Sequence, residues 1–504
     1  MYSRHAIAAV LALLPASAVW AAPATDDGAA RLKGVFESYL SATEGVVTVK
    51  AAGDVYDLTI DPAPLLAKIP SDEIAVTILP MTYHLTDNGD GTWKVTEDQD
   101  VSWNVKVKGL QDQKLTAHSR SEGIWDESLA AYREMSGEMT NMVSDTVQYQ
   151  TPVGRYNEQG QYVEPDPSET PAVLSRDHQT IERASFKTTG KAASNGGVDV
   201  VGTFDVQNVA QQSELGVLDP ANPIKIGFAA PSYTGNVKID GLQSKGILTL
   251  ASWFVAHPDE DLVKAQQEDL RGKLSAALPL WDELAVDADV KTVSITSPYG
   301  NFGVDRLGVQ LAVSGATPDG HLREKLSFDK LTVPEGLLPE WGVPLLPEQL
   351  NFEFDIKGFD LAAPAKMVIA AFDLNDKHDP LGKLDKDAVS KAFLPNGKLA
   401  VSLIDSNIAG KDYNIKYSAD LQTGFEDGDI PTGTAKISAT GLDNVQAALQ
   451  AAPQELAGQP LMMLTMARAL AKPGIDKGEQ VWAIDATTPG VVKVNDMPIG
   501  GPGQ

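Results

Sequence analysis

The chain has 504 residues, 43% of them hydrophobic, and it carries a formal net charge of −27 with no cysteine. The apolar content is sufficient for a folded core, so the composition excludes a wholly disordered protein. Binding to nucleic acid needs a cationic surface, and the acidic excess excludes that class of partner. Without cysteine, neither a disulfide framework nor a thiolate zinc site can form.

Residues 1–21 have the pattern of a secretory signal peptide. Arg4 and His5 give a short positive start, residues 6–14 form a continuous apolar run, and Ala21 ends a segment of the kind that signal peptidases cleave. We expect cleavage after Ala21 and a periplasmic mature protein. No later segment has about 18 consecutive apolar residues, so no transmembrane span is expected after cleavage.

Alternation of apolar and polar residues dominates the chain that follows. It predicts strands over residues 46–50, 56–60, 74–79, 82–86, 92–96 and 101–107. The sequence Asp87-Asn88-Gly89-Asp90-Gly91 favours a tight hairpin turn, because Asn and Gly tolerate positive φ. A period of two with short turns indicates antiparallel sheets that have one buried and one solvated face.

Several segments have the apolar spacing of helices instead. We predict helices over residues 29–42, 127–143, 242–256, 260–274 and 456–470. The last of these contains Met462, Met463 and Met466. We expect this helix to pack on a sheet as part of the core. The alternative is a helix that touches a membrane surface, for which the methionines would supply an adaptable apolar side.

One local pattern recurs, in which a strand ends in Gly and a large apolar residue, and a helix often follows. It occurs at Gly109-Leu110, Gly241-Leu242, Gly358-Phe359 and Gly441-Leu442. Gly permits a strand to end in a conformation closed to other residues. We therefore predict an α+β, β-rich fold of long curved antiparallel sheets with packed helices, built from degenerate strand–Gly–helix units. Coincidence in a β-rich chain is the alternative.

Proline-rich loops set the expected domain boundaries. The best one is Leu218-Asp219-Pro220-Ala221-Asn222-Pro223. It divides the mature chain into an N-terminal β-rich half, residues 22–217, and a C-terminal β-rich half with helices, residues 218–497. Residues 498–504 are Gly-rich and are predicted to be a disordered tail.

The sequence offers no convincing catalytic, cofactor-binding or metal-ligating residues. The mature chain has six histidines, none at metal-ligand spacing with another on one element: His84, His118, His178, His257, His321 and His378. Ser327 and Lys330 match Ser-x-x-Lys spacing in strand-like sequence, without the partner motifs. The acidic stretches at residues 87–91 and 373–377 fail the pattern of a calcium loop and are expected to be turns. We predict no cofactor.

The exported start, the repeated strand–Gly–apolar pattern and the closing sequence at residues 490–498 resemble domain-of-unknown-function family 2125 of exported alphaproteobacterial proteins. The final strand also resembles that of YdgA-like proteins, although Asp496 stands where Gly is more usual. The resemblance implies periplasmic location and no assigned catalytic residues. A more distant likeness to AsmA-like envelope proteins implies curved sheets that form a groove for lipids.

These observations give one leading expectation and two alternatives. The leading one is a non-enzymatic protein of the cell envelope that binds a lipid or other apolar ligand in a sheet groove. The first alternative is a scaffold or interaction module of an envelope complex, which would use exposed sheet edges. The second is a hydrolase of envelope polymers, with carboxylates from distant parts of the chain gathered in one cleft.

Overall fold

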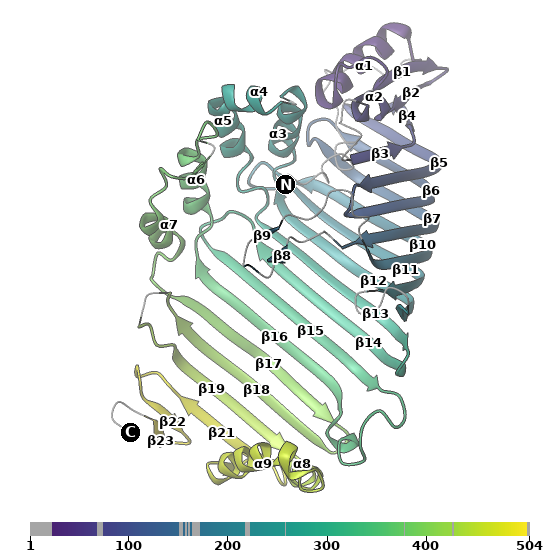
Figure 1. Ribbon diagram of the computed structural model, residues 1–504. Coiled ribbons are helices and arrows are strands. Elements are labelled where there is room, and N and C mark those ends of the chain that lie inside the picture. The colour runs from purple at the N-terminus through teal and green to yellow at the C-terminus, as the bar shows by residue number, and fades with distance from the viewer. Residues whose placement is uncertain are drawn as a thin grey trace. The chain divides into compact units, whose positions relative to one another are not determined.

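The computed structural model describes residues 23–67, 74–150, 155–156, 159, 162–163, 172–216, 222–257, 259–376, 378–425 and 428–500 (Figure 1). It is 53% strand and 21% helix, with one large antiparallel sheet of 21 strands, which confirms the β-rich prediction. A second sheet pairs only β8 (Arg155–Tyr156) with β9 (Tyr162–Val163). The expected signal peptide lies outside the described residues and stays a prediction.

The chain contacts divide it into two compact units. The N-terminal unit holds the chain up to residue 234 with residues 244–266 and 294–300, and the C-terminal unit holds residues 235–243, 267–293 and the chain from 301 onward. Residues 217–221 lie outside the described part, so the boundary expected at residue 218 remains a prediction.

Strands of the N-terminal unit pair in the order β1-β2-β4-β5-β6-β7-β10-β11, and β3 pairs with the second half of β5. Their bounds are β1 (Val47–Ala52), β2 (Val55–Ile60), β3 (Ile74–Ile78), β4 (Met81–Asp87), β5 (Thr92–Val107), β6 (Gln111–Asp126), β7 (Ala131–Tyr149), β10 (Val173–Ala192) and β11 (Val198–Leu215). Strands β12 (Ile224–Leu242) and β13 (Glu283–Ser297) contribute residues to both units.

Strands of the C-terminal unit pair in the order β14-β15-β16-β17-β18-β19-β21-β22-β23, and β20 adds a short pairing to β21. Their bounds are β14 (Gly300–Ser314), β15 (Gly320–Thr332), β16 (Pro347–Phe359), β17 (Leu399–Gly410), β18 (Tyr413–Thr423), β19 (Thr432–Thr440), β20 (Lys472–Pro473), β21 (Gln480–Asp485), β22 (Val492–Val494) and β23 (Met497–Gly500). From β14 to β19, strands that follow one another in the sequence are therefore also hydrogen-bonded neighbours in the sheet.

The helices of the described residues lie between or after strands. They are α1 (Asp26–Leu40), α2 (Ala63–Leu66), α3 (Ser244–Ala256), α4 (Glu260–Ala265), α5 (Gln267–Ala277), α6 (Ala362–Ala371), α7 (Lys386–Phe393), α8 (Leu442–Gln450) and α9 (Gln454–Ala469), with the 3₁₀ turn η2 (Val343–Leu345). The helices predicted over residues 29–42, 242–256, 260–274 and 456–470 correspond to α1, α3, α4 with α5, and α9.

The helix predicted over residues 127–143 is wrong. Residues 127–130 form the turn between β6 and β7, and the rest belongs to β7, which pairs along its length with β6 and β10. Tyr132, Met135 and Met139 have a spacing compatible with a helix. Ladder hydrogen bonds on both edges of the strand outweigh that local preference.

Glycines with positive φ stand where several strands end. Gly241, Gly358 and Gly441 have φ of 66°, 89° and 74°, and α3, α6 and α8 begin within four residues of them. A Cβ at Gly441 would lie 1.9 Å from the carbonyl oxygen of Asp412, so this position requires Gly for space as well as for φ. Gly109, with φ of 67°, lies in the turn to β6 with no helix after it.

The chain end differs from the predicted tail. Asn495 and Asp496 have φ of 50° and 71°, the two left-handed conformations of a hairpin turn, and they join β22 to β23. Residues 498–500 therefore belong to a strand rather than to a disordered segment. Asn495 reinforces the turn, because its side chain donates to the carbonyls of Leu470 and Val481, both at 2.8 Å. Residues 501–504 lie outside the described part.

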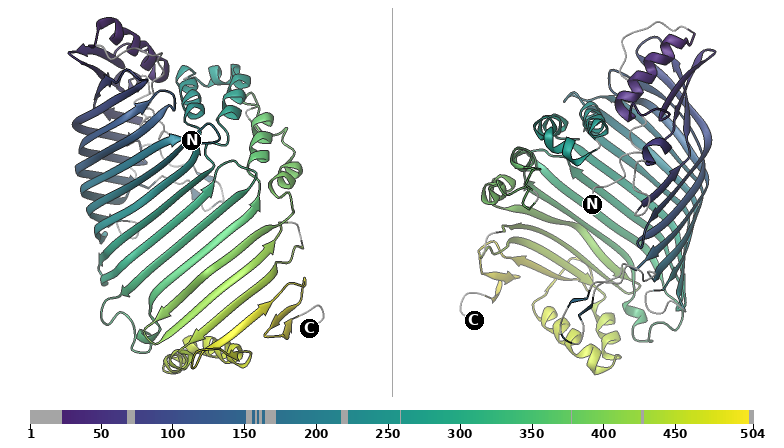
Figure 2. Two further views of the ribbon diagram at one scale, coloured as in Figure 1. Left: turned by 180° about the vertical axis from the view of Figure 1, so that it is seen from behind. Right: turned by 45° about the horizontal axis from the view of Figure 1, so that its top comes forward.

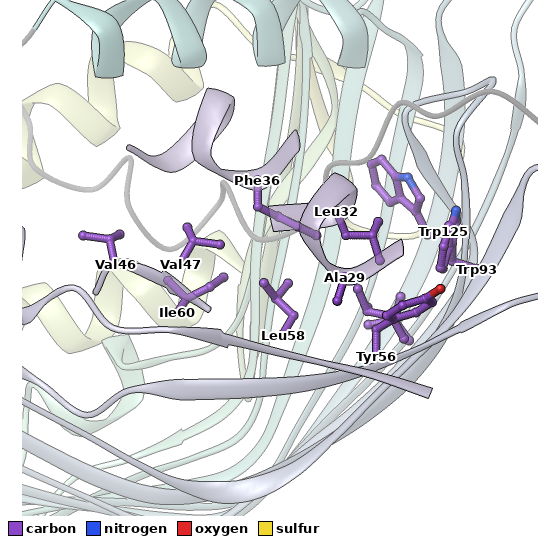
Figure 3. Close-up of a cluster of buried hydrophobic side chains, with 12 residues drawn as sticks. Ala29, Leu32, Phe36, Val46, Val47, Tyr56, Leu58, Ile60, Trp93 and Trp125 are labelled. Carbon is purple, nitrogen blue, oxygen red and sulfur yellow. The ribbon is translucent and has the colours of Figure 1, made fainter. Parts of the chain in front are cut away.

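The N-terminal core forms between α1 and the first strands (Figure 3). Thr25 caps α1 by accepting a hydrogen bond from the Gly28 amide at 3.1 Å, and Asp26 and Asp27 favour the positive end of the helix dipole. The face defined by Ala29, Leu32 and Phe36 is buried against aromatic and aliphatic side chains of β2, β4, β5 and β6: Tyr56, Leu58, Ile60, Leu85, Trp93 and Trp125.

Shortening Leu32 should leave a cavity in this core. Its side chain is 0% exposed, and we expect Leu32→Ala to lower the free energy of unfolding of the N-terminal unit by about 3 kcal/mol. Urea denaturation followed by tryptophan fluorescence measures it, because Trp93 and Trp125 pack in the same cluster. Arg31→Ala is the control, since that residue is exposed on the same helix. Equal losses for both variants would contradict this account of the core.

Asp126 organises the turn between β6 and β7. Its Oδ1 accepts hydrogen bonds from the Ser128 amide at 2.7 Å and the Leu129 amide at 3.2 Å, and its Oδ2 accepts from Arg133 Nε at 2.6 Å. Burial alone would raise the pKa of this carboxyl, but the hydrogen bonds from Ser128, Arg133 and Leu129 outweigh it and lower the pKa below 3.8.

A depressed carboxyl pKa stabilises the fold above the pKa of the unfolded state, and that stability is lost as pH falls through the folded-state pKa. We expect Asp126→Asn to lower the free energy of unfolding at pH 7 by about 1–2 kcal/mol. The difference from the unsubstituted protein should shrink below about pH 4, where the unfolded carboxyl takes up its proton. Urea midpoints at pH 7 and pH 3 test this, and a constant difference would contradict it.

Candidate functional site

Strict alternation gives the C-terminal unit one apolar sheet face. From β14 to β18, about four alternate residues of each strand are apolar, and the strand register places most of them opposite apolar residues of the neighbouring strand. We define this surface as the C-terminal apolar face, formed by Leu307, Val309, Leu311, Val313, Leu322, Glu324, Leu326, Phe328, Leu350, Phe352, Phe354, Ile356, Val401, Leu403, Ile408, Ile415, Tyr417, Ala419 and Leu421. Glu324 is its one charged member.

The opposite face of the same strands holds the charges. Arg323 Nε donates to Glu353 Oε1 at 2.8 Å, and Lys325 Nζ lies 3.4 Å from Glu353 Oε2. Lys357 Nζ lies 2.6 Å from Asp355 Oδ2, and Arg306 pairs with Asp289. Charged side chains are therefore segregated to the face opposite the apolar one, as expected for an antiparallel sheet with one apolar side, although Glu353 and Asp355 on that face are themselves only 4% and 8% exposed.

Left-handed residues inside the strands preserve this segregation. Lys330 and Asp405 have φ of 53° and 37° in β15 and β17, and Asn141 and Asn208 have φ of 52° in β7 and β11. Each lies at an interruption of the strand pairing, and a β-bulge accompanies Asn141 between β6 and β7 and Asp405 in β17. Lys330 pairs with Asp305 at 2.9 Å. These four residues are polar, as is Thr292 of β13 with φ of 54°, so no apolar side chain is turned outward there.

Among the described residues, helices pack against the C-terminal apolar face at the ends of its strands. Phe393 and Leu394, at the end of α7, pack with Phe359 and Leu399, while Leu464 and Ala467 of α9 pack with Ala439 and Trp482. Figures 1 and 2 show α6 and α7 at one end of these strands and α8 and α9 at the other. Leu307 and Leu326, at the middle of strands β14 and β15, remain 38% and 37% exposed.

The N-terminal unit has an equivalent surface on β5, β6, β7, β10 and β11. Its central members, in register, are Val95, Val101, Met135, Met139, Met142, Ile181, Ala184, Phe186, Phe204, Val206 and Val209. Helix α1 packs at one end of this N-terminal apolar face, against Trp93 and Trp125. Two carboxylates, Glu97 and Asp177, lie on it.

Both carboxylates are held by neutral donors. Glu97, 8% exposed, accepts from Ser119 Oγ at 2.5 Å and Gln99 Nε2 at 2.7 Å. Asp177 accepts from Ser175 Oγ at 2.8 Å and Ser213 Oγ at 2.5 Å. Burial, and then the nearby charge of Glu97, raise the pKa of the Tyr132 hydroxyl to about 12. The same two causes raise the pKa of Tyr83.

Removing the Glu97 charge should therefore ease ionisation of Tyr132. We expect Glu97→Gln to lower the Tyr132 pKa while leaving it above 10, because burial remains the larger cause. Absorbance of the phenolate between pH 9 and pH 12.5 measures it, with Tyr132→Phe identifying the contribution of this residue. An unchanged titration in the Glu97 variant would show that the carboxylate does not act on Tyr132.

A hollow of about 750 Å³ crosses the polar side of the N-terminal strands. Asp98, Glu122, Glu138 and Asp205 reach it from four strands, together with basic side chains. Two of these carboxylates have side-chain partners close by: Arg183 Nε donates to Glu138 at 2.9 Å, and the neutral amide of Gln207 donates to Asp205 at 2.8 Å. This arrangement is typical of a solvated sheet surface.

The histidines single out no common site. His84, His118 and His178 each hydrogen-bond an aspartate across neighbouring strands, Asp57, Asp100 and Asp145, at 2.7–2.9 Å. His321 lies 3.1 Å from Glu283, His257 contacts the Trp253 carbonyl at 2.7 Å, and the amide of His378 donates to Asp376. Among the residues that the structure describes, no three potential ligands gather to hold a metal.

The remaining sequence candidates lie in ordinary structural roles. Asp87 and Asp90 hydrogen-bond amides within their own hairpin turn. Asp373 pairs with Lys383 at 2.8 Å, which, with the Asn375 amide, lowers its pKa to about 2. Ser327 lies in β15 on the polar side. The helix predicted over residues 456–470 packs as expected, through Leu464 and Ala467 of α9, while Met462, Met463 and Met466 on its other side are about 60% exposed.

Comparison with known proteins gives no match. No protein-family model, no curated protein and no solved structure matches this chain. Within the described ranges, no helix is long and apolar enough to span a membrane.

Proposed function

We propose that this protein is a non-enzymatic binding protein for an amphiphile with a hydrocarbon chain, and that the C-terminal apolar face is the binding surface. The observation that carries the proposal is the exposure of Leu307 and Leu326 at the middle of strands β14 and β15, in an apolar surface that helices of the described residues pack at its strand ends. Exposed contiguous apolar surface of this extent is characteristic of interaction sites.

The dimensions of the surface suit a hydrocarbon chain. Adjacent strands lie about 4.8 Å apart, so five strands extend about 19 Å, and seven residues along one strand extend about 20 Å. The hydrocarbon core of a bilayer is about 30 Å thick, so a single lipid chain spans about 15 Å. Each buried methylene group contributes about 0.8 kcal/mol to binding, before the cost of ordering the chain.

The setting is part of the same proposal. Residues 1–21 support export to the periplasm, and the resemblance to family 2125 and to AsmA-like proteins supports a role in the cell envelope. The glycines at the ends of β12, β16 and β19 are consistent with duplicated strand–Gly–helix units. Such duplication would explain how a long sheet keeps one apolar side.

The alternatives have less support. A hydrolase needs carboxylates free to react, whereas Glu138 and Asp205 in the polar hollow are engaged by Arg183 and Gln207. A scaffold would use an unpaired strand edge, and β23 is only four residues long. Neither alternative accounts for the apolar surface at Leu307 and Leu326.

Placing a charge on the apolar face should weaken binding of a neutral fluorescent probe, N-phenyl-1-naphthylamine. We expect Leu326→Arg to raise the dissociation constant of this probe by about tenfold or more. A tenfold change corresponds to the loss of about 1.4 kcal/mol of binding free energy, which is the size expected when apolar contact with one leucine is removed. Ser327→Arg is the matched control, since the next residue along β15 faces the polar side. Equal effects of both variants, or no binding to the unsubstituted chain, would contradict the proposal.

Ligand carried from the cell gives a second measurement. Protein purified from its native host should release a reproducible lipid on solvent extraction, identified by mass spectrometry, and the Leu326→Arg variant should release much less. Loss from the variant with retained thermal stability assigns the lipid to this face. Equal amounts from both proteins would place the lipid elsewhere.

A further inference from the structure

We propose that Glu324 selects the headgroup of the bound amphiphile, and that this headgroup carries a positively charged ammonium group. The proposal rests on the binding function proposed above and adds the chemical class of the ligand. It depends on the charge distribution over the C-terminal apolar face and on the surroundings of one carboxylate.

Glu324 is surrounded by apolar side chains. Leu322 and Leu326 flank it on β15, and its cross-strand partners are Leu311 on β14 and Phe354 on β16. The ring of Phe354 lies beside that of Phe352, with 5.8 Å between centroids. The Glu324 side chain is half-buried in this setting. A carboxylate so placed loses part of its hydration, and an opposite charge would compensate for that loss.

The protein supplies no such charge. Among the described residues, none forms a hydrogen bond or ion pair with Glu324. The basic residues of β14 to β18 lie on the polar side or, for Lys330, at an interruption of the strand pairing and in an ion pair with Asp305: Arg306, Arg323, Lys325, Lys330, Lys357 and Lys416. Glu353 has partners in Arg323 and Lys325, and Asp355 has one in Lys357, whereas Glu324 lies on the apolar face with neither a hydrogen bond nor an ion pair to any described residue.

The charged residues of the N-terminal apolar face also favour a positively charged ligand group. Its two charged residues, Glu97 and Asp177, are both acidic, and both accept hydrogen bonds from neutral donors only. Charge complementarity therefore favours a cationic group on either face and disfavours a carboxylate or phosphate headgroup. Glu324 differs from these two in having no donor of its own, so its acceptor sites remain available.

A geometry for the complex follows from these neighbours. The ammonium group binds the Glu324 carboxylate, and its hydrocarbon chain lies over Leu307 and Leu326, the two most exposed leucines of the face. Phe354 lies in register beside Glu324, where its ring can also contact a cation. Binding then uses one ion pair and a run of methylene contacts.

The test compares three amphiphiles that share one chain: dodecylamine, dodecanol and dodecanoate, each below its micelle concentration at pH 7. Displacement of N-phenyl-1-naphthylamine from the full chain gives the three affinities. We expect the amine to bind about tenfold more tightly than the alcohol, and the carboxylate to bind most weakly. Raising the salt concentration should reduce the difference in affinity between the amine and the alcohol, because salt screens an ion pair that is partly exposed.

Variants assign the selectivity to one residue. Glu324→Gln should remove the preference for the amine while leaving dodecanol binding unchanged, and Glu324→Lys should reverse the preference toward dodecanoate. Asp329→Asn is the matched control, because it removes a carboxylate from the polar side of the same strand. Thermal unfolding of each variant excludes a general loss of structure.

The outcomes separate the two proposals. If none of the amphiphiles binds, the proposed function fails and this inference fails with it. If all three bind with equal affinity, or if Glu324→Gln keeps the preference for the amine, the binding function stands and the role of Glu324 is refuted. Tightest binding of dodecanoate to the unsubstituted chain would also refute it.

Discussion

The structure depends on cross-strand register that keeps apolar side chains opposite apolar ones over successive strands. Because side chains alternate with a period of two, a slip of one residue in any strand would place its charges among leucines and phenylalanines. The polar ion pairs of Glu353 with Arg323 and Lys325, and the opposing row of Leu326 and Phe352, therefore impose the same register from opposite sides. This constraint produces both the long sheet and the apolar faces on it.

Much of this organisation could be predicted from the sequence. The alternation in residues 46–60 and 92–107 indicated antiparallel strands, and the spacing of Leu32 and Phe36 indicated α1, as the structure has them. The prediction failed at β7, where methionines and a tyrosine have spacing that also suits a helix. Only pairing with two neighbouring strands decides such a segment, and pairing is not visible in one strand's own residues.

The candidate site was harder to predict for a related reason. Glu324 is one acidic residue among many in a chain of net charge −27, and its sequence neighbours Arg323 and Lys325 suggest a paired surface carboxylate. The difference from Glu353 arises across strands, where Glu324 meets Leu311 and Phe354 while Glu353 meets arginine and lysine. A search for charged residues at apolar positions of a two-residue repeat would have identified Glu324 as a candidate.

The strands from β14 to β19 form a simple meander, in which each strand pairs with the next one along the chain. In such a meander, the gain or loss of one hairpin leaves the pairing of the other strands unchanged. The number of strands in this region can therefore change by two at a time during evolution, and the width of the apolar face changes in proportion. Duplication of a short gene segment that encodes one hairpin would be sufficient for such a change.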